Sequence, residues 1–184
     1  VTVSGSAENG GRLEVLDGGT FSAGGLTNTN TGEVVVYAGG RLVDDLDNAG
    51  TVTNGGTYEA RVNSNTGTIT NDGTWTGNVG GNVNLITNQN GGTWTGDVEA
   101  NGGTIENTSG AGWSGAVQGN SGTITSTGAG STWQGAVEAN GSAIENLDGS
   151  GWTGDVQANL GTITNGGTDT TWSGAVTTNG GTIT

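Results

Sequence analysis

The sequence predicts an all-β fold, a parallel β-solenoid of the right-handed β-helix type with about 19–20 residues per coil. The first observation is an internal repeat, because the 6 tryptophans recur at steps of 19 or 20 residues. The second is a short alternation of apolar and polar residues, broken by Asn-Gly or Gly-Gly, which indicates short strands and tight turns. The third is composition: 41 Gly, 32 Thr and 21 Asn among 184 residues disfavour helices.

Each repeat carries an aromatic residue, a valine 4 positions later and an isoleucine 11 positions later. The tryptophans are Trp75, Trp94, Trp113, Trp133, Trp152 and Trp172, the valines run from Val79 to Val176, and the isoleucines run from Ile86 to Ile183. The same spacing extends back to Tyr58, Val62 and Ile69 and loosens before them. We therefore expect one β-helix, with irregular N-terminal coils over residues 1–57 and regular Trp/Val/Ile coils over residues 58–184.

The spacing also locates the turn that varies in length. The aromatic residue and the isoleucine stay 11 residues apart, whereas the isoleucine and the next aromatic residue are 6 to 9 residues apart. A segment of variable length is a loop, so each coil is expected to be a rigid arc followed by one elastic turn. Left-handed solenoids keep strict coils built from hexapeptides, so the variable period favours the right-handed form.

A unit of this length cannot bury its apolar side chains alone, so we expect Trp to stack on Trp, Val on Val and Ile on Ile. At a rise of about 4.8 Å per coil, about eight or nine coils would form a rod of roughly 40 Å. Few inward residues are needed in each coil. This explains why Leu, Ile, Val and Phe together make up only 32 of the 184 residues.

Asparagine and glycine also occupy fixed columns. The first column lies 7 positions after the aromatic residue (Asn65, Asn82, Asn101, Asn120, Asn140, Asn159, Asn179). The second lies 2 positions after the isoleucine, or after Val52 in the first case, and has one serine among its asparagines (Asn54, Asn71, Asn88, Asn107, Ser126, Asn146, Asn165). They can take left-handed turn conformations or form hydrogen-bonded ladders between coils. A glycine follows each tryptophan by 2 positions and is expected to leave room beside the indole.

Charge composition excludes several function classes. The chain has no Cys, His or Lys, its net charge is −14, and its only cations are Arg12, Arg41 and Arg61. Nucleic-acid binding and attraction to anionic lipid both need cations, so we expect neither. No apolar run approaches the length of a membrane span, so we expect no membrane contact by this segment.

Candidate catalytic residues are few. Gly119-Asn120-Ser121-Gly122 superficially resembles a serine-protease nucleophile loop, but no His or Lys is available as a base, so we interpret Ser121 as a turn residue. Glu99 and Glu138 are two coils apart, about 10 Å, and two such carboxylates could serve a glycosidase. They alternate with Gln118 and Gln157 as an ordinary repeat column, which favours a solvated face over an active site.

Two further patterns concern the binding of calcium and of ice. The pattern of a calcium-binding loop is matched only in part by Asp44, Asp45 and Asp47. An EF-hand loop needs a glutamate at its twelfth position, and the twelfth position counted from Asp45 is Gly56. We therefore predict no catalytic, cofactor-binding or metal-binding residues.

Threonines flank inward residues as Thr-x-Thr in 51–53, 68–70, 123–125, 162–164 and 182–184, a pattern used by some ice-binding β-helices. Glu106 and Glu145 interrupt that column, as do Leu85 and Ala143.

Degenerate Gly-Thr-Ile-Thr-Asn-Gly-Gly repeats in an acidic, Cys-free chain resemble the passenger regions of Gram-negative autotransporters (type V secretion). The resemblance covers nearly the whole chain. It implies a right-handed β-helix displayed on the bacterial surface and carried outside by a C-terminal membrane barrel. Because the chain stops mid-coil at Thr184, we expect it to be a fragment that continues into further coils or a barrel.

The expected function is therefore a non-enzymatic structural or adhesive rod, extracellular and displayed on the outer membrane, with an unknown surface, carbohydrate or protein ligand. The alternative from another class is a carbohydrate-active β-helix segment, of the polysaccharide lyase or glycosidase kind. A third, weaker alternative is an ice-binding β-solenoid. Uncapped coil ends expose unpaired strands, so end-to-end self-association is also expected.

Overall fold

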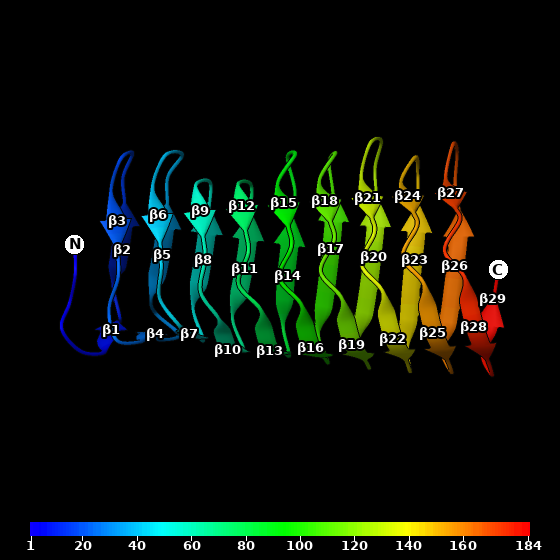
Figure 1. Ribbon diagram of the computed structural model, residues 1–184, viewed down its shortest axis with the longest axis horizontal. Helices are drawn as coiled ribbons and strands as arrows, with labels where there is room; N and C mark the ends of the chain where they lie inside the picture. Colours follow the sequence, from blue (N-terminus) through cyan, green and yellow to red (C-terminus); the bar gives the residue numbers. More distant parts are fainter.

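The chain forms a parallel β-solenoid of three sheets that wrap around one core. A computed structural model describes residues 1–184, and it contains strands and turns but no helix, so no helix is present that could span a membrane. Sheet 1 has 10 strands, sheet 2 has 10 and sheet 3 has 9, and each coil contributes one strand to each sheet. The coils lie side by side along the long axis, with the two termini at opposite ends of the rod (Figure 1).

Strand bounds follow the repeat. Sheet 1 contains β1 (Ala7–Asn9), β4 (Leu26–Asn28), β7 (Leu46–Asn48), β10 (Val62–Asn65), β13 (Val79–Asn82), β16 (Val98–Asn101), β19 (Val117–Asn120), β22 (Val137–Asn140), β25 (Val156–Asn159) and β28 (Val176–Asn179). Sheet 2 contains β2 (Arg12–Val15), β5 (Glu33–Val36), β8 (Thr51–Asn54), β11 (Thr68–Asn71), β14 (Leu85–Asn88), β17 (Thr104–Thr108), β20 (Thr123–Thr127), β23 (Ala143–Leu147), β26 (Thr162–Gly166) and β29 (Thr182–Ile183). Sheet 3 contains β3 (Thr20–Phe21), β6 (Arg41–Leu42), β9 (Thr57–Tyr58), β12 (Thr74–Trp75), β15 (Thr93–Trp94), β18 (Gly112–Trp113), β21 (Thr132–Trp133), β24 (Gly151–Trp152) and β27 (Thr171–Trp172).

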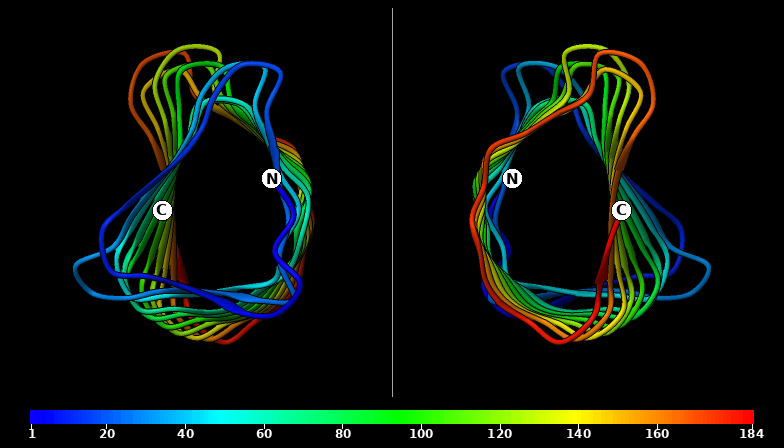
Figure 2. Two further views of the ribbon diagram at one scale, coloured as in Figure 1. Left: turned by 90° about the vertical axis from the view of Figure 1, so that its left-hand side faces the viewer. Right: turned by 90° about the vertical axis from the view of Figure 1, so that its right-hand side faces the viewer.

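The winding is right-handed, as the sequence predicts. In the end-on view from the N-terminus, the chain descends on one side, sheet 1 crosses the bottom, and sheet 2 rises on the other side (Figure 2, left). This clockwise path recedes from the viewer as the chain advances. The view from the C-terminal end shows the same sense, with the last strand rising toward the C-terminus (Figure 2, right).

The elastic turn lies between sheet 2 and sheet 3, where the variable spacing places it. All four residues other than glycine with positive φ occur in these turns: Asn90 at 53°, Ser109 at 54°, Asp148 at 49° and Asp169 at 57°. Three of them precede or follow a glycine that is also left-handed, as in Asn90-Gly91. The other two corners keep nearly constant length, because the strands on either side are paired in register with the neighbouring coils.

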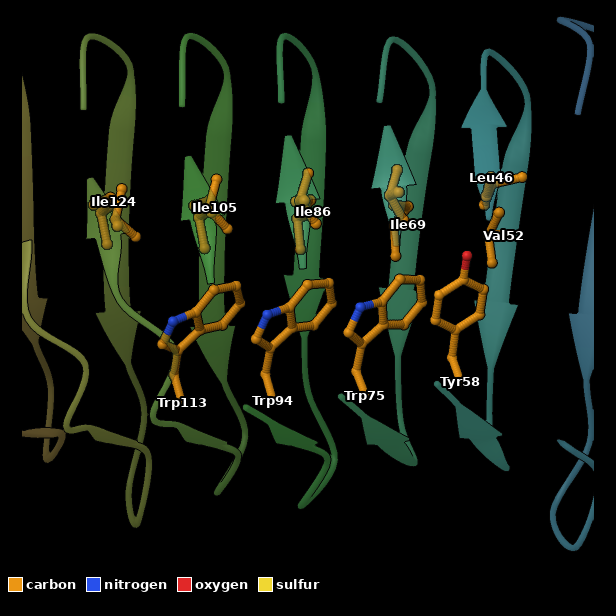
Figure 3. Close-up of a cluster of buried hydrophobic side chains, with 14 of the residues drawn as sticks. Leu46, Val52, Tyr58, Ile69, Trp75, Ile86, Trp94, Ile105, Trp113 and Ile124 are labelled. Carbon is orange, nitrogen blue, oxygen red and sulfur yellow. The ribbon is translucent and has the colours of Figure 1, made fainter. Parts of the chain in front are cut away.

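The core consists of identical residues stacked coil upon coil. Register pairs Trp94 with Trp113, Val98 with Val117 and Ile105 with Ile124, and the same pairing continues along the rod. The rings of Tyr58 and the tryptophans lie parallel beneath the isoleucine column (Figure 3). The tryptophans from Trp75 to Trp152 are at most 1% exposed. The predicted stacking of Trp on Trp, Val on Val and Ile on Ile is therefore confirmed.

The position two residues after each tryptophan requires glycine for a different reason from the one expected. A Cβ on Gly96 or Gly115 would overlap the carbonyl oxygen of the corresponding glycine in the preceding coil. The backbones thus approach too closely for any side chain, and the indole is not the obstacle. Each indole Nε1–H instead donates to the carbonyl of the glycine two residues later, at 2.8 Å from Trp113 to Gly115.

Asparagines of sheet 1 form one unbroken amide ladder inside the rod. Each Nδ2 donates to the Oδ1 of the next coil, as from Asn101 to Asn120 at 2.8 Å and from Asn120 to Asn140 at 2.7 Å. The ladder starts at Asn9 and runs through Asn28, Asn48, Asn65, Asn82, Asn101, Asn120, Asn140, Asn159 and Asn179. Its first three members were not identified in the sequence. Asn9 and Asn48 have no aromatic residue 7 positions before them, whereas Asn28 follows Phe21 by 7 positions and does fit the count.

The second ladder, on sheet 2, is interrupted. It runs from Asn54 to Asn107 and stops at Ser126, whose Oγ has no partner. Beyond the gap, Asn146 Oδ1 accepts from Ser150 Oγ at 2.6 Å instead of from a ladder amide. The alternative interpretation of these columns, left-handed turns, does not hold. Asn90, which is in neither ladder, is the only asparagine with positive φ.

We predict that Trp133→Ala destabilises the protein by about 3–5 kcal/mol, because truncating a fully buried aromatic residue leaves a cavity and interrupts the ring stack. Urea or thermal unfolding measures the change. Glu138→Gln, an exposed change in the following strand, is the control and should alter stability little. An unchanged melting temperature for Trp133→Ala would contradict the stacked core.

Asn120→Ala is expected to cost about 2–4 kcal/mol, because it leaves the Nδ2 of Asn101 and the Oδ1 of Asn140 buried without their ladder partners. Equilibrium unfolding again provides the measurement. The matched control is Gln118→Ala, two residues earlier on the same strand and exposed to solvent. Equal effects of the two substitutions would show that the ladder contributes nothing.

Candidate functional site

The three outer faces differ in charge, and sheet 3 alone presents a long uncharged surface. We call this surface the threonine face. It consists of the outward residues on either side of each tryptophan: Thr74, Thr76, Thr93, Thr95, Gly112, Ser114, Thr132, Gln134, Gly151, Thr153, Thr171 and Ser173. Sheet 1 carries Glu99 and Glu138, and sheet 2 carries Glu106 and Glu145. The threonine face is therefore the neutral side of an acidic rod.

Several hydroxyls of the threonine face are held in one orientation by the backbone. Thr95 Oγ1 donates to the carbonyl oxygen of Trp75 at 3.2 Å, and Ser114 Oγ donates to that of Trp94 at 3.3 Å. Each bond joins a hydroxyl to the preceding coil. The hydroxyl hydrogen is donated to the backbone, so the lone pairs of the oxygen remain available to solvent. Together these oxygens form an ordered row of hydrogen-bond acceptors.

A shallow groove crosses the threonine face at Gly112. Its volume is about 180 Å³, and it is lined by Thr93, Thr95, Ser114, Thr132 and Gln134. It exists because Gly112 stands where the preceding and following coils have Thr93 and Thr132. A Cβ at Gly112 would meet only Thr132 Oγ1, at an ordinary 3.6 Å, so the backbone does not demand glycine here.

The side chains of the acidic segment, Asp44, Asp45 and Asp47, do not converge on one point. Asp44 is 4% exposed and lies inside the coil, whereas Asp45 and Asp47 are exposed. No group of three or more His, Cys, Asp or Glu side chains is placed to hold a metal ion. A depression of about 370 Å³ beside the segment is lined by Asp44, Asp45, Ala60 and small residues of the preceding coil.

Asp44 is the one carboxylate buried in the core. It occupies the position that glycine takes in the regular coils, two residues after the inward residue Leu42, and its Oδ2 has no hydrogen-bond partner. Burial raises the pKa of Asp44, backbone amides of Ala23 and Gly25 oppose the shift, and the charge of Asp45 adds to it. An unpaired carboxylate here destabilises the native state whenever it is ionised.

All three arginines are used in exposed ion pairs with glutamates. Arg12 contacts Glu14 and Glu33, Arg41 contacts Glu59, and Arg61 contacts Glu99 at 2.7 Å. Hydrogen bonds from these partners lower the pKa of Glu14, Glu59 and Glu99, with Tyr37 making the largest contribution at Glu14. The guanidinium of Arg61 reaches Glu99 across Gly80, so the pair links three successive coils.

The residues singled out in the sequence lie on different faces. Glu99 and Glu138 are exposed on sheet 1, and Ser121 lies in the turn after β19, where Ser121 Oγ donates to the carbonyl oxygen of Asn101. The Thr-x-Thr positions of sheet 2 are mostly half-buried, as at Thr123 and Thr125. The exposed threonines instead flank tryptophan on sheet 3. The Thr-Trp-Thr triplets at 74–76 and 93–95 were the sequence signal for this face.

Comparisons of this chain with protein-family models, with curated proteins and with solved structures found no match.

We predict that Asp44→Asn stabilises the protein at neutral pH and leaves its stability unchanged near pH 3. The folded pKa of Asp44 is raised above its unfolded value, so the native state gains stability when the group is protonated and loses it as pH rises through the folded pKa. Unfolding by urea across this pH range measures the difference. Asp47→Asn, an exposed change nearby, is the control, and a parallel pH profile for wild type and Asp44→Asn would contradict the prediction.

Proposed function

We propose that this chain is a non-enzymatic structural and adhesive rod, a segment of a secreted, surface-displayed passenger of the autotransporter kind. The observation that carries the proposal is the threonine face, an uncharged row of exposed hydroxyls along one side of a stiff acidic rod. Continuous amide and aromatic columns give the rod its stiffness, and the neutral side gives it a surface that can approach another polar surface without charge repulsion.

The proposed ligand class of the threonine face is a neutral, hydroxyl-rich polymer such as a neutral polysaccharide. The face offers neither cations for an anionic polymer nor carboxylates for a cationic one. Its rows of hydroxyl oxygens can accept hydrogen bonds from sugar hydroxyls, and the groove at Gly112 offers a recess between two threonines.

No specific observation favours the alternative of a carbohydrate-active enzyme, because Glu99 is paired with Arg61 and Glu138 is exposed in a repeat column.

Affinity electrophoresis through gels containing dextran or a soluble β-glucan tests the adhesive surface. The wild-type chain is expected to be retarded by at least one of these neutral glucans but not by polygalacturonate. Ser114→Glu should abolish the retardation because it places a charge beside the groove. Gln118→Glu adds the same charge to sheet 1 and should have no effect. Retardation that is absent in the wild type, or lost equally in both variants, would refute the proposal.

Ice binding is kept as a second candidate because of one observation, the exposed Thr-Trp-Thr rows of β12 and β15. Gly112→Thr separates the two candidates. It completes the threonine column between Thr93 and Thr132, which should increase thermal hysteresis if the face orders ice, while it fills the groove and should weaken glucan binding. Absence of thermal hysteresis in both the wild type and Gly112→Thr would eliminate ice binding.

A further inference from the structure

The buried aromatic column is a continuous stack of rings along the rod. The ring centroids of Tyr58 and Trp75 are 3.9 Å apart, and those of successive tryptophans are 4.6 to 4.9 Å apart. Neighbouring indole planes differ by at most 5°. No coil between Tyr58 and Trp172 lacks its ring, and Figure 3 shows the first four rings in the same orientation, one coil after another. Overlapping π systems at this separation can exchange electrons.

Oxidation of this protein is chemically restricted to its indole and phenol rings, and all but one of these lie in the aromatic column. The chain contains no Cys, no Met and no His, so the side chains that usually react first with oxidants are missing. Indole and phenol are the remaining groups that give up one electron readily. Apart from Tyr37, which is on the surface at 40% exposure, all of them lie in the aromatic column.

The hydrogen bonds of the indoles favour a mobile positive charge. Each Nε1–H donates to a peptide carbonyl, at 2.8 Å from Trp94 to Gly96 and at 2.8 Å from Trp133 to Gly135. A peptide carbonyl is too weak a base to take the proton, and the rings from Tyr58 to Trp152 are shielded from water, whereas Trp172 at the end of the column is partly exposed. An indole that has lost an electron therefore keeps its proton and its charge. Because the next indole is chemically identical, the charge can pass to it at little energetic cost.

The charge distribution of the rod also favours a positive charge in this column. The net charge is −14, and from Val62 to Thr184 the chain has carboxylates but no cation. The indoles from Trp75 to Trp172 all lie in that part. A low-dielectric interior transmits the field of the surrounding carboxylates, so an indole radical cation is stabilised there relative to one in a neutral protein.

We propose that the aromatic column conducts positive holes along the rod. A one-electron oxidant, such as a photo-oxidised ruthenium polypyridyl complex, takes one electron from an indole and is itself reduced. The neighbouring indole then transfers one electron to the oxidised ring, so the positive hole moves one coil at a time. No bond forms or breaks and no proton leaves while the hole moves. The hole disappears when a one-electron reductant fills it. Alternatively, water adds to an oxidised ring, which then releases two protons and gives a second electron to the cobalt(III) acceptor to form a stable oxidised indole.

A site-specific oxidant tests the transport. Since the chain lacks Cys, Thr171→Cys creates a unique attachment point for the ruthenium complex beside Trp172. After flash oxidation with a cobalt(III) acceptor in dilute protein, top-down mass spectrometry maps oxidised indoles. We expect oxidation products at Trp75 and Trp94, at the far end of the column, as well as at Trp172. Trp113→Leu, made in the same background, should reduce the far-end products to background level.

Two controls keep the result interpretable. Ile105→Val alters the neighbouring core column without touching a ring, and it should leave the far-end products unchanged. Trp113→Phe keeps an aromatic ring of higher oxidation potential, so it should also block transport even if Trp113→Leu fails to fold. Folding of each variant is checked by its cooperative melting.

Three results would overturn the proposal: oxidation confined to Trp172 and Trp152 in the uninterrupted column, equal far-end yields with and without Trp113, or far-end yields that rise with protein concentration. Transient absorption provides an independent readout. The indole radical cation and the neutral indole radical have distinct visible spectra, and we expect the cation to persist. Immediate appearance of the neutral radical would show that the indole proton is lost.

Discussion

In-register parallel pairing between coils is the constraint on which the rest of this protein depends. It places every residue beside its counterpart in the next coil, as with Ile105 on Ile124 and Trp113 on Trp133, so in the regular coils each inward side chain stacks on its own kind. Flat rings and branched aliphatic side chains satisfy this condition by packing. Carboxylates do not, and Glu106 is accordingly followed by Thr125 and then by Glu145 in the same column.

The amide side chain satisfies the same constraint in another way. Asparagine carries a donor and an acceptor on one rigid group, so a column of it can form a hydrogen-bonded chain in which only an end is left without a partner, as at the buried Oδ1 of Asn54 on sheet 2. Serine is too short to bridge the coils, and at Ser126 the ladder breaks and leaves an unpaired hydroxyl. Asp44 shows the cost of placing a charge in the same interior, since its Oδ2 has no partner and its pKa is raised by burial.

Sequence reasoning predicted the stacked columns and the elastic turn because both are written as spacings between recognisable residues. It missed Asn9 and Asn48 as ladder members because no aromatic residue precedes them by 7 positions, Leu42 being where later coils have Trp; it also missed Asn28, although Phe21 precedes it by that spacing. It also gave the wrong reason for the glycine after each tryptophan. The obstacle is a backbone carbonyl of the neighbouring coil, and distances between backbones are not visible in a sequence.

The sequence by itself determined the solenoid, its period and the residues that stack, because a repeat of fixed spacing has only one way to bury its apolar side chains. Only the tertiary structure decided which exposed faces are neutral. The Thr-x-Thr positions on sheet 2 are mostly half-buried and alternate with carboxylates at Glu106 and Glu145, whereas the threonines around the tryptophans of sheet 3 are exposed and uncharged. The physical reason is that exposure depends on how the three sheets meet at their corners, a property of the assembled coil that no single repeat encodes.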